Sequence, residues 1–428
     1  VLVMTSGNRS SEPMAFQDAD ALERLSGLAD AVLIGERPVA RRIDDSVVRP
    51  TSSGPVFLRR ARGYAPSPVA RLPTSRPILA LGADLKSAPL LAVDGQAFLA
   101  PYVGDLSHYG AEVAFRETVH HLLATYDLEV GDVLVVHDAH PGYRSTAFAR
   151  DLQDEGVETV AVQHHRAHVA SVLAERDAWD TQVVGLALDG LGWGDDETAW
   201  GGEVFSGSLR DGLERVDHLR PAWLPGGDAA ARWPVQAAAG FLFDTSGLPD
   251  LEAEPFRFPP RYRQALRLIE AEVQATRTTS MGRLFDAAAA LCGFVGEQTY
   301  EGQAAAWLEA TARQSGPVEP YPFPDLDHRP LLRAIVRDRA VDRPVRETAR
   351  AFHAGLASGL ARVARREQDA LRAEAVVASG GVFANALLTE ALRGYLFDCP
   401  LWLPHRVPVG DGGIALGQAA LAIAGEPA

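Results

Sequence analysis

Cysteine is scarce in this sequence, which contains only Cys292 and Cys399 among 428 residues. The two lie far apart in apolar surroundings, and no CxxC pair occurs. These features disfavour a disulfide framework and a zinc site made of thiolates. We therefore expect reduced thiols, both in the protein core, and a cytoplasmic location.

Long apolar runs and long basic stretches are also missing. No segment reaches the roughly 18 apolar residues that span a bilayer, so no membrane partner is expected. The formal net charge of −15 repels phosphate backbones, so no nucleic-acid partner is expected either. The opening stretch, VLVMTSGNRSS, lacks the basic segment and cleavage site of a signal peptide and is typical of the middle of a domain.

The pattern of strands and helices predicts two α/β lobes. The length indicates two or three domains, and residues 67–77, rich in proline, form the best candidate linker after a first segment, 1–66. Two later stretches share a plan of an apolar strand, a turn with Asp and Gly, and a returning strand. We interpret them as a duplication, with lobes at 78–181 and 182–428 and a helical insertion at 230–314. Strands that alternate with helices imply a parallel core.

Two histidines form the first candidate site. In VQHHRAHVASVLAE a strand gives way to a helix, and His164 and His168 stand one helical turn apart on the same face. Both rings could then reach one metal ion. The alternative is a hydrated helix start, and the spacing alone leaves both open. Two imidazoles need further ligands, usually carboxylates when the metal is iron, zinc or manganese.

Two carboxylates occur at suitable positions for completing such a set. Asp189 ends an apolar strand before Gly190, and Asp411 precedes the last helix. Both lie where a strand gives way to a turn, the place at which α/β sheets bind their ligands. Each also has an ordinary explanation, Asp189 as a turn residue and Asp411 as a helix N-cap.

Glycine-bearing turns before helices are candidates for holding an anion. Gly380, Gly381 and Asn385 cluster between a strand and a helix in ASGGVFANALL, and Gly302 lies in the similar turn YEGQAA. Glycine lets a backbone approach a ligand closely, and a helix N-terminus favours negative charge. Asp286 lies at the start of a helix with Arg283, where a surface ion pair is the alternative.

Other polar residues are weaker candidates. Lys86 follows a strand, and the loop HDAHPGYRST, after another strand, carries His137, Asp138, His140 and Tyr143. Separately, residues 18–33 have the apolar spacing of a helix. For each polar group a solvated or hydrogen-bonded surface role is the alternative. Candidate phosphate contacts, besides Lys86, are Ser6, Asn8 and Arg59.

These segments together resemble the hydrogenase maturation carbamoyltransferases, the HypF family. The resemblance covers nearly the whole chain. It rests on TSGNRSSEP, RIDDSVVR, RRARGYAP, HPGYRST, VQHHRAHVASVLAE, LDGLGWGDDETAWGGE, LPGGDAA, GRLFDAAAAL, YEGQAA, SGGVFAN and DGGIALGQA, in family order. It implies an α/β fold: a partial YrdC-like segment over 1–66, then a two-lobed, duplicated ribonuclease-H-like domain of the sugar kinase, Hsp70 and actin type, shared with threonylcarbamoyl-adenosine synthases.

The resemblance also implies a reaction. In the family, carbamoyl phosphate and ATP yield carbamoyl-adenylate, and the carbamoyl group passes to the C-terminal cysteine of the partner HypE, to become the cyanide ligand of nickel–iron hydrogenase. The implied cofactors are ATP or carbamoyl-adenylate and a divalent metal, iron or zinc, with magnesium accompanying the nucleotide as a further alternative. The metal positions carry over to His164, His168, Asp189 and Asp411. The nucleotide positions carry over to Gly190, Asp286, Gly302, Gly380, Gly381 and Asn385.

The sequence departs from the family pattern in one major respect. It contains no acylphosphatase domain, no zinc-finger cysteines and no first half of the YrdC-like domain. We therefore expect these 428 residues to use supplied carbamoyl-adenylate but not to make it from carbamoyl phosphate. Two other functions stay open: a small-molecule O-carbamoyltransferase of antibiotic biosynthesis, and a non-catalytic scaffold or tRNA-modification partner, against which the acidic charge counts.

Overall fold

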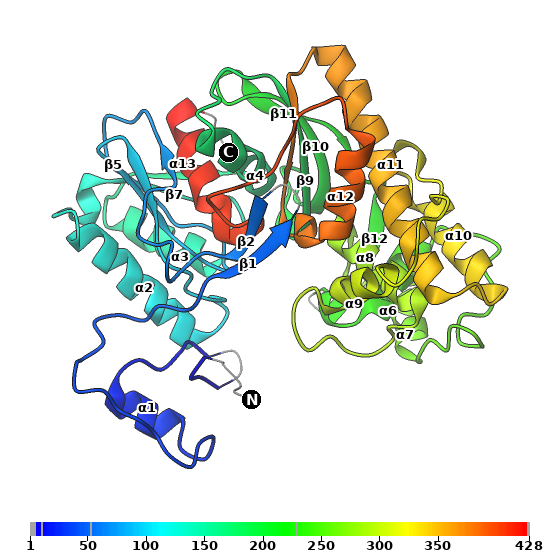
Figure 1. Ribbon diagram of the computed structural model, residues 1–428, viewed down its shortest axis with the longest axis horizontal. Helices are drawn as coiled ribbons and strands as arrows, with labels where there is room; N and C mark the ends of the chain where they lie inside the picture. The colour runs from blue at the N-terminus through cyan, green and yellow to red at the C-terminus, as the bar shows by residue number, and fades with distance from the viewer. Residues whose placement is uncertain (1–5, 10–11, 52–53, 228, 426–428) are drawn as a thin grey trace. The chain divides into compact units, whose positions relative to one another are not determined.

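A computed structural model describes residues 6–9, 12–51, 54–227 and 229–425 (Figure 1). The chain divides into two compact units, one of residues 1–179 and 404–428 and the other of residues 180–403. The expected lobe boundary at 181/182 stays a prediction, although the closing residues group with the first unit. Among the described residues, no helix has both the length and the apolarity to cross a bilayer.

The first unit is built on a mixed six-stranded sheet of order β3-β6-β5-β4-β7-β8. Its strands are β3 (Ala70–Arg71), β4 (Ile78–Ala80), β5 (Leu90–Val93), β6 (Gln96–Leu99), β7 (Leu134–Asp138) and β8 (Thr159–Val162). Strands β4, β5 and β6 form an antiparallel meander, whereas β4, β7 and β8 are parallel. The buried apolar residues of β4 and β7 explain why these strands are central.

Helices cover the sheet of the first unit. They are α2 (Tyr109–Ala124), α3 (Arg144–Asp154), α4 (His164–Glu175) and α13 (Ile414–Ala424), with the short 3-10 helices η1 (Val130–Asp132) and η4 (Asp411–Gly413). Phe115 of α2 meets Phe148 of α3 edge to face, with ring centroids 5.8 Å apart, within one apolar core. Helices α4 and α13 lie side by side (Figure 1), and most residues of both are buried.

Gly417 determines how closely α13 approaches α4. A Cβ added to it would lie 1.8 Å from the carbonyl oxygen of Ala167. We expect Gly417→Ala to lower the free energy of unfolding by about 1–3 kcal/mol or more, because the helices must separate. Gly131→Ala is the control, since a Cβ there meets nothing within 4 Å. Chemical denaturation of both variants tests this, and equal stability would contradict the close packing.

The second unit repeats the strand plan of the first. Its seven-stranded sheet follows the order β12-β13-β10-β9-β14-β15, with β11 paired to β10. The strands are β9 (Val183–Trp193), β10 (Ala199–Ser208), β11 (Gly212–His218), β12 (Ala222–Pro225), β13 (Ala275–Thr278), β14 (Ala375–Ser379) and β15 (Leu401–Trp402). Strands β9, β10 and β11 form a meander, and β9, β14 and β15 are parallel. The predicted duplicated α/β fold is confirmed.

A group of helices follows β12 and precedes β14 along the chain in the second unit. They are α5 (Ala229–Arg232), α6 (Pro234–Leu242), α7 (Arg261–Glu270), α8 (Met281–Cys292), α9 (Gln303–Ala312), η2 (Pro324–Leu326), α10 (His328–Ala340) and α11 (Val345–Leu371). Helix η3 (Gly381–Ala384) and helix α12 (Ala386–Tyr395) follow β14. Every residue of α8 except Gly282 is buried, so its alanine-rich sequence serves close packing.

The N-terminal part holds less regular structure than the sequence predicts. The helix expected over residues 18–33 is wrong in extent, because α1 spans only Asp18–Arg24 and has no buried residue. Leu28 beyond it is exposed, and Gly27 has a left-handed φ of +85°. Strands β1 (Val47–Thr51) and β2 (Gly54–Arg59) form an antiparallel pair. An apolar helical face needs a surface to pack on, and α1 buries none of its side chains.

Candidate functional site

The histidines predicted to bind metal lie on the first turns of α4. The side chain of Gln163 caps this helix by accepting a hydrogen bond from the backbone N–H of Arg166. This fixes the helix start at the end of β8, so His164 and His168 point to the same side. Their ring centroids are 5.0 Å apart, and both side chains are buried. A hydrated helix start is therefore wrong for these two residues.

Asp411 brings a carboxylate to the two imidazoles. Its Oδ1 lies 3.6 Å from Nε2 of His168 and 4.0 Å from Nε2 of His164, and Asp411 is itself buried in η4. These separations exceed hydrogen-bonding distance, but donors that share one ion at about 2 Å are spaced in this way. Nitrogen and carboxylate donors together suit zinc or iron. The donor set of this unit therefore fits a divalent metal.

One further carboxylate touches the histidine pair. Oδ2 of Asp138, at the end of β7, lies 2.7 Å from Nδ1 of His164, and both side chains are fully buried. Asp138 was named in the sequence only as part of a polar loop. Its contact with His164 depends on β7 and β8 being neighbours in the sheet, which the local sequence does not reveal.

Asp189 lies in the second unit, inside β9. The strand continues beyond it to Trp193, so the expected strand end and turn at Asp189 are wrong. Its Oδ1 accepts hydrogen bonds from the backbone N–H groups of Gly190 at 2.7 Å and Gly381 at 3.1 Å. Gly381 follows β14, the parallel neighbour of β9, so the two strands place these residues together. The side chain of Asp189 is buried. One carboxylate oxygen of Asp189 is thus held by two backbone N–H groups.

Small residues allow the backbone to pack closely around Asp189. Gly380 has φ +107°, and a Cβ on it would lie 2.2 Å from the carbonyl oxygen of Leu188. Gly282, in the first turn of α8, approaches Gly190 so closely that an added Cβ would be 2.8 Å from the Gly190 Cα. Ser280 caps α8 and its hydroxyl donates to the carbonyl of Gly190. The N-terminus of α8 is therefore fixed against the end of β9.

Asp286 is not part of a surface ion pair. Its carboxylate is fully buried and lies 2.9 Å from Nε of Arg283, whose side chain is also buried. Burial raises the pKa of Asp286 to about 6, and the positive charge of Arg283 opposes this rise. Gln298 donates to Oδ1 of Asp286 at 3.3 Å and accepts from the backbone N–H of Ala304 at 2.9 Å. Asp286 is thereby linked to the start of α9, where Gly302 is the N-cap with φ +75°.

The raised pKa of Asp286 predicts a specific pH dependence of stability. The folded protein keeps the proton to higher pH than the unfolded chain, so stability falls as pH rises from about 4 to about 6. The contribution is up to about 3 kcal/mol, because one pKa unit corresponds to about 1.4 kcal/mol. We expect Asp286→Asn to lose this slope, measured by urea denaturation across that range. An unchanged slope would mean that Asp286 titrates normally.

Asn385 is held by a buried histidine. Its Oδ1 accepts from the backbone N–H of Leu388 as the N-cap of α12, and its Nδ2 donates to Nε2 of His353 at 3.0 Å. Nδ1 of His353 donates to the carbonyl of Ala349, and burial lowers the pKa of His353 to about 4. The neutral imidazole therefore fixes the Asn385 amide. His353 and Gln298 were both missed, because neither lies in a recognisable motif.

The weaker candidates in the first unit have protein partners. Arg59 pairs with Asp44 at 3.6 Å and lies over the ring of Tyr102. Lys86 has φ +50°, and its carbonyl oxygen packs against Gly412, beside Asp411. The side chains of Ser6, which is exposed, and Asn8, which is half-buried, hydrogen bond to each other. Their phosphate or carbamoyl contacts stay predictions.

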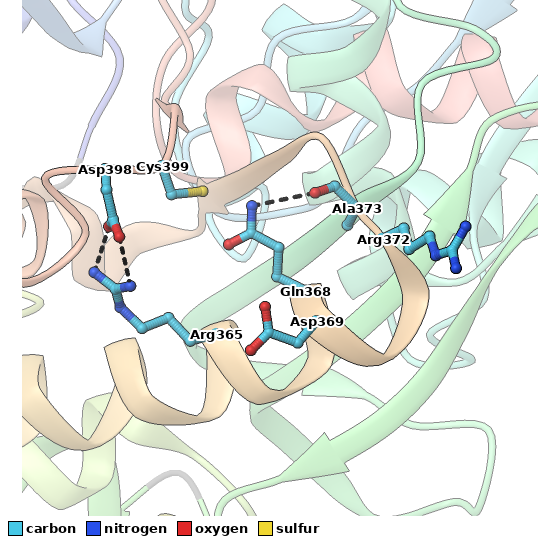
Figure 2. Close-up of a pocket in the computed structure, with 7 residues that line it drawn as sticks. All are labelled: Arg365, Gln368, Asp369, Arg372, Ala373, Asp398 and Cys399. Carbon is cyan, nitrogen blue, oxygen red and sulfur yellow. Dashed lines mark hydrogen bonds and ion pairs between the residues drawn. The ribbon is translucent and has the colours of Figure 1, made fainter.

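Only one of the cysteines is a core residue. Cys292 is buried at the end of α8, and burial raises the pKa of its thiol to about 12. Cys399 is partly exposed and lines a hollow of about 410 Å³ at the C-terminal end of α11, so its core assignment is wrong (Figure 2). In this hollow Arg365 pairs with Asp398, and Gln368 donates to the carbonyl of Ala373 at 3.1 Å. The side chains of Arg365, Asp398 and Gln368 thus have hydrogen-bond or ion-pair partners within the protein.

Three family models match successive parts of the chain. Their descriptions are "Telomere recombination" of the Sua5, YciO and YrdC type for residues 1–61, "HypF Kae1-like domain" for 73–175, and "Carbamoyltransferase, Kae1-like Domain, second subdomain" for 185–418. The matches follow the order that the sequence resemblance implies.

Named relatives support the same assignment. The chain is 41% identical to carbamoyltransferase HypF of Rhodobacter capsulatus, over 99% of this chain and 57% of that protein. It is 37% identical to a carbamoyltransferase HypF homolog of Cupriavidus necator, over 80% of this chain and 90% of that protein. The chain thus spans somewhat more than half the length of the R. capsulatus protein.

Solved structures agree with the sequence comparisons. A full-length HypF in a phosphate- and nucleotide-bound form matches with a TM-score of 0.91 and 33% identity, over 98% of this chain and 66% of that one. HypF of T. kodakarensis matches with a TM-score of 0.91 and 31% identity, over 98% of this chain and 57% of that one.

Proposed function

Because the chain belongs to the HypF family of carbamoyltransferases, we propose that it transfers a carbamoyl group from carbamoyl-adenylate to the C-terminal cysteine of a HypE-type acceptor protein. This step would serve the synthesis of the cyanide ligand of nickel–iron hydrogenase. The observation that carries the proposal is the buried convergence of His164, His168 and Asp411, in a chain whose relatives are carbamoyltransferases.

We propose that Asp189 completes the metal set. Its position within β9, with one oxygen held by backbone N–H groups, gives it the fixed orientation that a ligand needs. A divalent metal, iron or zinc, would act as a Lewis acid toward the carbamoyl oxygen. Two histidines and two carboxylates are the ligand set expected for such an ion. Among these residues, His164 is held by Asp138, and Asp189 is held by backbone N–H groups.

The residues of the second unit are proposed to hold the adenylate. The glycine turn at η3 and the start of α8 at Gly282 are proposed to face the phosphate, because helix N-termini favour negative charge. Asp286 and Asn385, connected to neighbouring helices by Gln298 and His353, are proposed to contact the nucleoside. Gly190 and Gly302 are proposed to let the backbone approach the nucleotide closely.

The transfer balances without a nucleophile from this chain. The acceptor thiolate sulfur attacks the carbamoyl carbon, a C–S bond forms, and the C–O bond to the adenylate phosphate breaks. AMP leaves with the electron pair of that bond, and the helix N-termini favour its negative charge. Neither cysteine of this chain is among the proposed site residues, because the acceptor protein is proposed to supply the nucleophile. Mass spectrometry of the acceptor after incubation with supplied carbamoyl-adenylate is the test.

A further inference from the structure

Asp138 is a buried carboxylate that the proposed reaction leaves without a role. It ends β7, has no exposed surface, and lies in the first unit with the histidines of α4. A buried carboxylate is costly unless its oxygens are hydrogen bonded. The partners that it has therefore indicate what it is for.

The backbone and one oxygen of Asp138 are fixed by local contacts. Its carbonyl oxygen accepts from the hydroxyl of Thr146 at 2.9 Å and from Nδ1 of His137 at 2.8 Å. Its Oδ1 accepts from the backbone N–H of His140 at 2.8 Å. These contacts close the turn after β7 and leave Oδ2 with a defined direction.

That direction is toward His164, at 2.7 Å from its Nδ1. An ionised carboxylate can only accept, so Nδ1 of His164 must carry the proton. A neutral imidazole carries only one proton, so Nε2 of His164 is then unprotonated and its lone pair can bind a metal ion. Nε2 is the atom that lies 4.0 Å from Oδ1 of Asp411, on the side of the proposed metal ligands.

We propose that Asp138 is a positioning residue that selects the tautomer and orientation of His164 for metal binding. The inference rests on the proposed metal site, because it concerns one of the ligands of that site. Carboxylates that hold a metal-bound histidine by its other nitrogen affect metal affinity about 10–100-fold. A role confined to closing the loop would affect folding instead.

The substitution Asp138→Asn separates these roles while keeping the shape. If the amide oxygen of the new side chain accepts from Nδ1 of His164, the amide NH₂ group faces the backbone N–H of His140, and two donors oppose each other there. If the amide is flipped, its NH₂ group instead opposes the N–H at Nδ1 of His164. Either way one contact is lost together with the negative charge, and we expect the affinity for Zn²⁺ to fall about 10-fold. Asp138→Ala, which removes both contacts, is expected to approach about 100-fold.

The experiment measures Zn²⁺ affinity of the whole chain by competition with a chelating dye, and the absorption spectrum of bound Co²⁺. Asp84→Asn is the matched control, because the carboxylate of Asp84 accepts from the backbone N–H groups of Arg144 and Ser145 and so holds the start of α3. We expect the control to keep its Zn²⁺ affinity and Co²⁺ spectrum, and both Asp138 variants to change them. Thermal unfolding of each variant reports the folded fraction.

The outcomes separate the two proposals. Unchanged Zn²⁺ affinity and an unchanged Co²⁺ spectrum in folded Asp138→Asn would overturn the positioning role alone. No Zn²⁺ or Co²⁺ bound to the unaltered chain would overturn the proposed metal site itself. If Asp138→Ala does not fold, the affinity of Asp138→Asn decides.

Discussion

His164→Ala is expected to remove the bound metal and abolish carbamoyl transfer while the protein stays folded. The substitution deletes a ligand rather than a neighbour of one, so metal affinity should fall by more than about 100-fold, the upper range for residues that only orient a ligand. Carbamoyl transfer should fall below detection for the same reason. Elemental analysis and an acceptor assay measure the two effects on the same preparation.

His165→Ala is the matched control for this variant. His165 is adjacent on α4 and equally buried, but it is not among the residues whose ligand atoms converge. We expect the control to keep its metal. Full metal content in His164→Ala, or equal loss in both variants, would contradict the assignment of His164 as a ligand.

Supplied carbamoyl-adenylate is expected to label a HypE-type acceptor with one carbamoyl group per chain when this protein is present. The expectation follows from the reaction, because the adenylate is already an activated mixed anhydride and only positioning and charge stabilisation remain. Intact-mass measurement of the acceptor gives the extent of labelling, and AMP release gives the stoichiometry.

An acceptor that lacks its C-terminal cysteine serves as the control. It should stay unlabelled at every concentration of adenylate. Equal labelling of the two acceptors would contradict the proposed nucleophile. Equal labelling with and without this protein would mean that the adenylate reacts unaided, and the proposed enzyme activity would fail.

The sequence was sufficient for the features that depend on local pattern. The histidine spacing placed His164 and His168 on one face of a helix, and the repeated strand–turn–strand plan predicted the two similar sheets. Asp411 was found by its position before the last helix, although its approach to α4 depends on the close packing at Gly417. These predictions rest on periodicities that a single stretch of chain carries.

The sequence was insufficient where partners are distant along the chain. Asp138 and His164 are 26 residues apart, and His353 and Asn385 are 32 apart. Their meeting depends on which strands and helices are neighbours, and no local pattern encodes that. Burial was missed for a similar reason: the Arg283–Asp286 pair looks like a surface pair in sequence, and Cys399 looks like a core residue.

Anomalous X-ray diffraction from crystals grown with Zn²⁺, recorded on both sides of the zinc absorption edge, tests the central claim most directly. We predict one strong anomalous peak that places a zinc ion within bonding distance of Nε2 of His164, Nε2 of His168 and a carboxylate oxygen of Asp411. Asp189 is predicted to be the fourth protein ligand. A peak at any other residues, or no peak near these three, would contradict the metal centre and the transfer mechanism built on it.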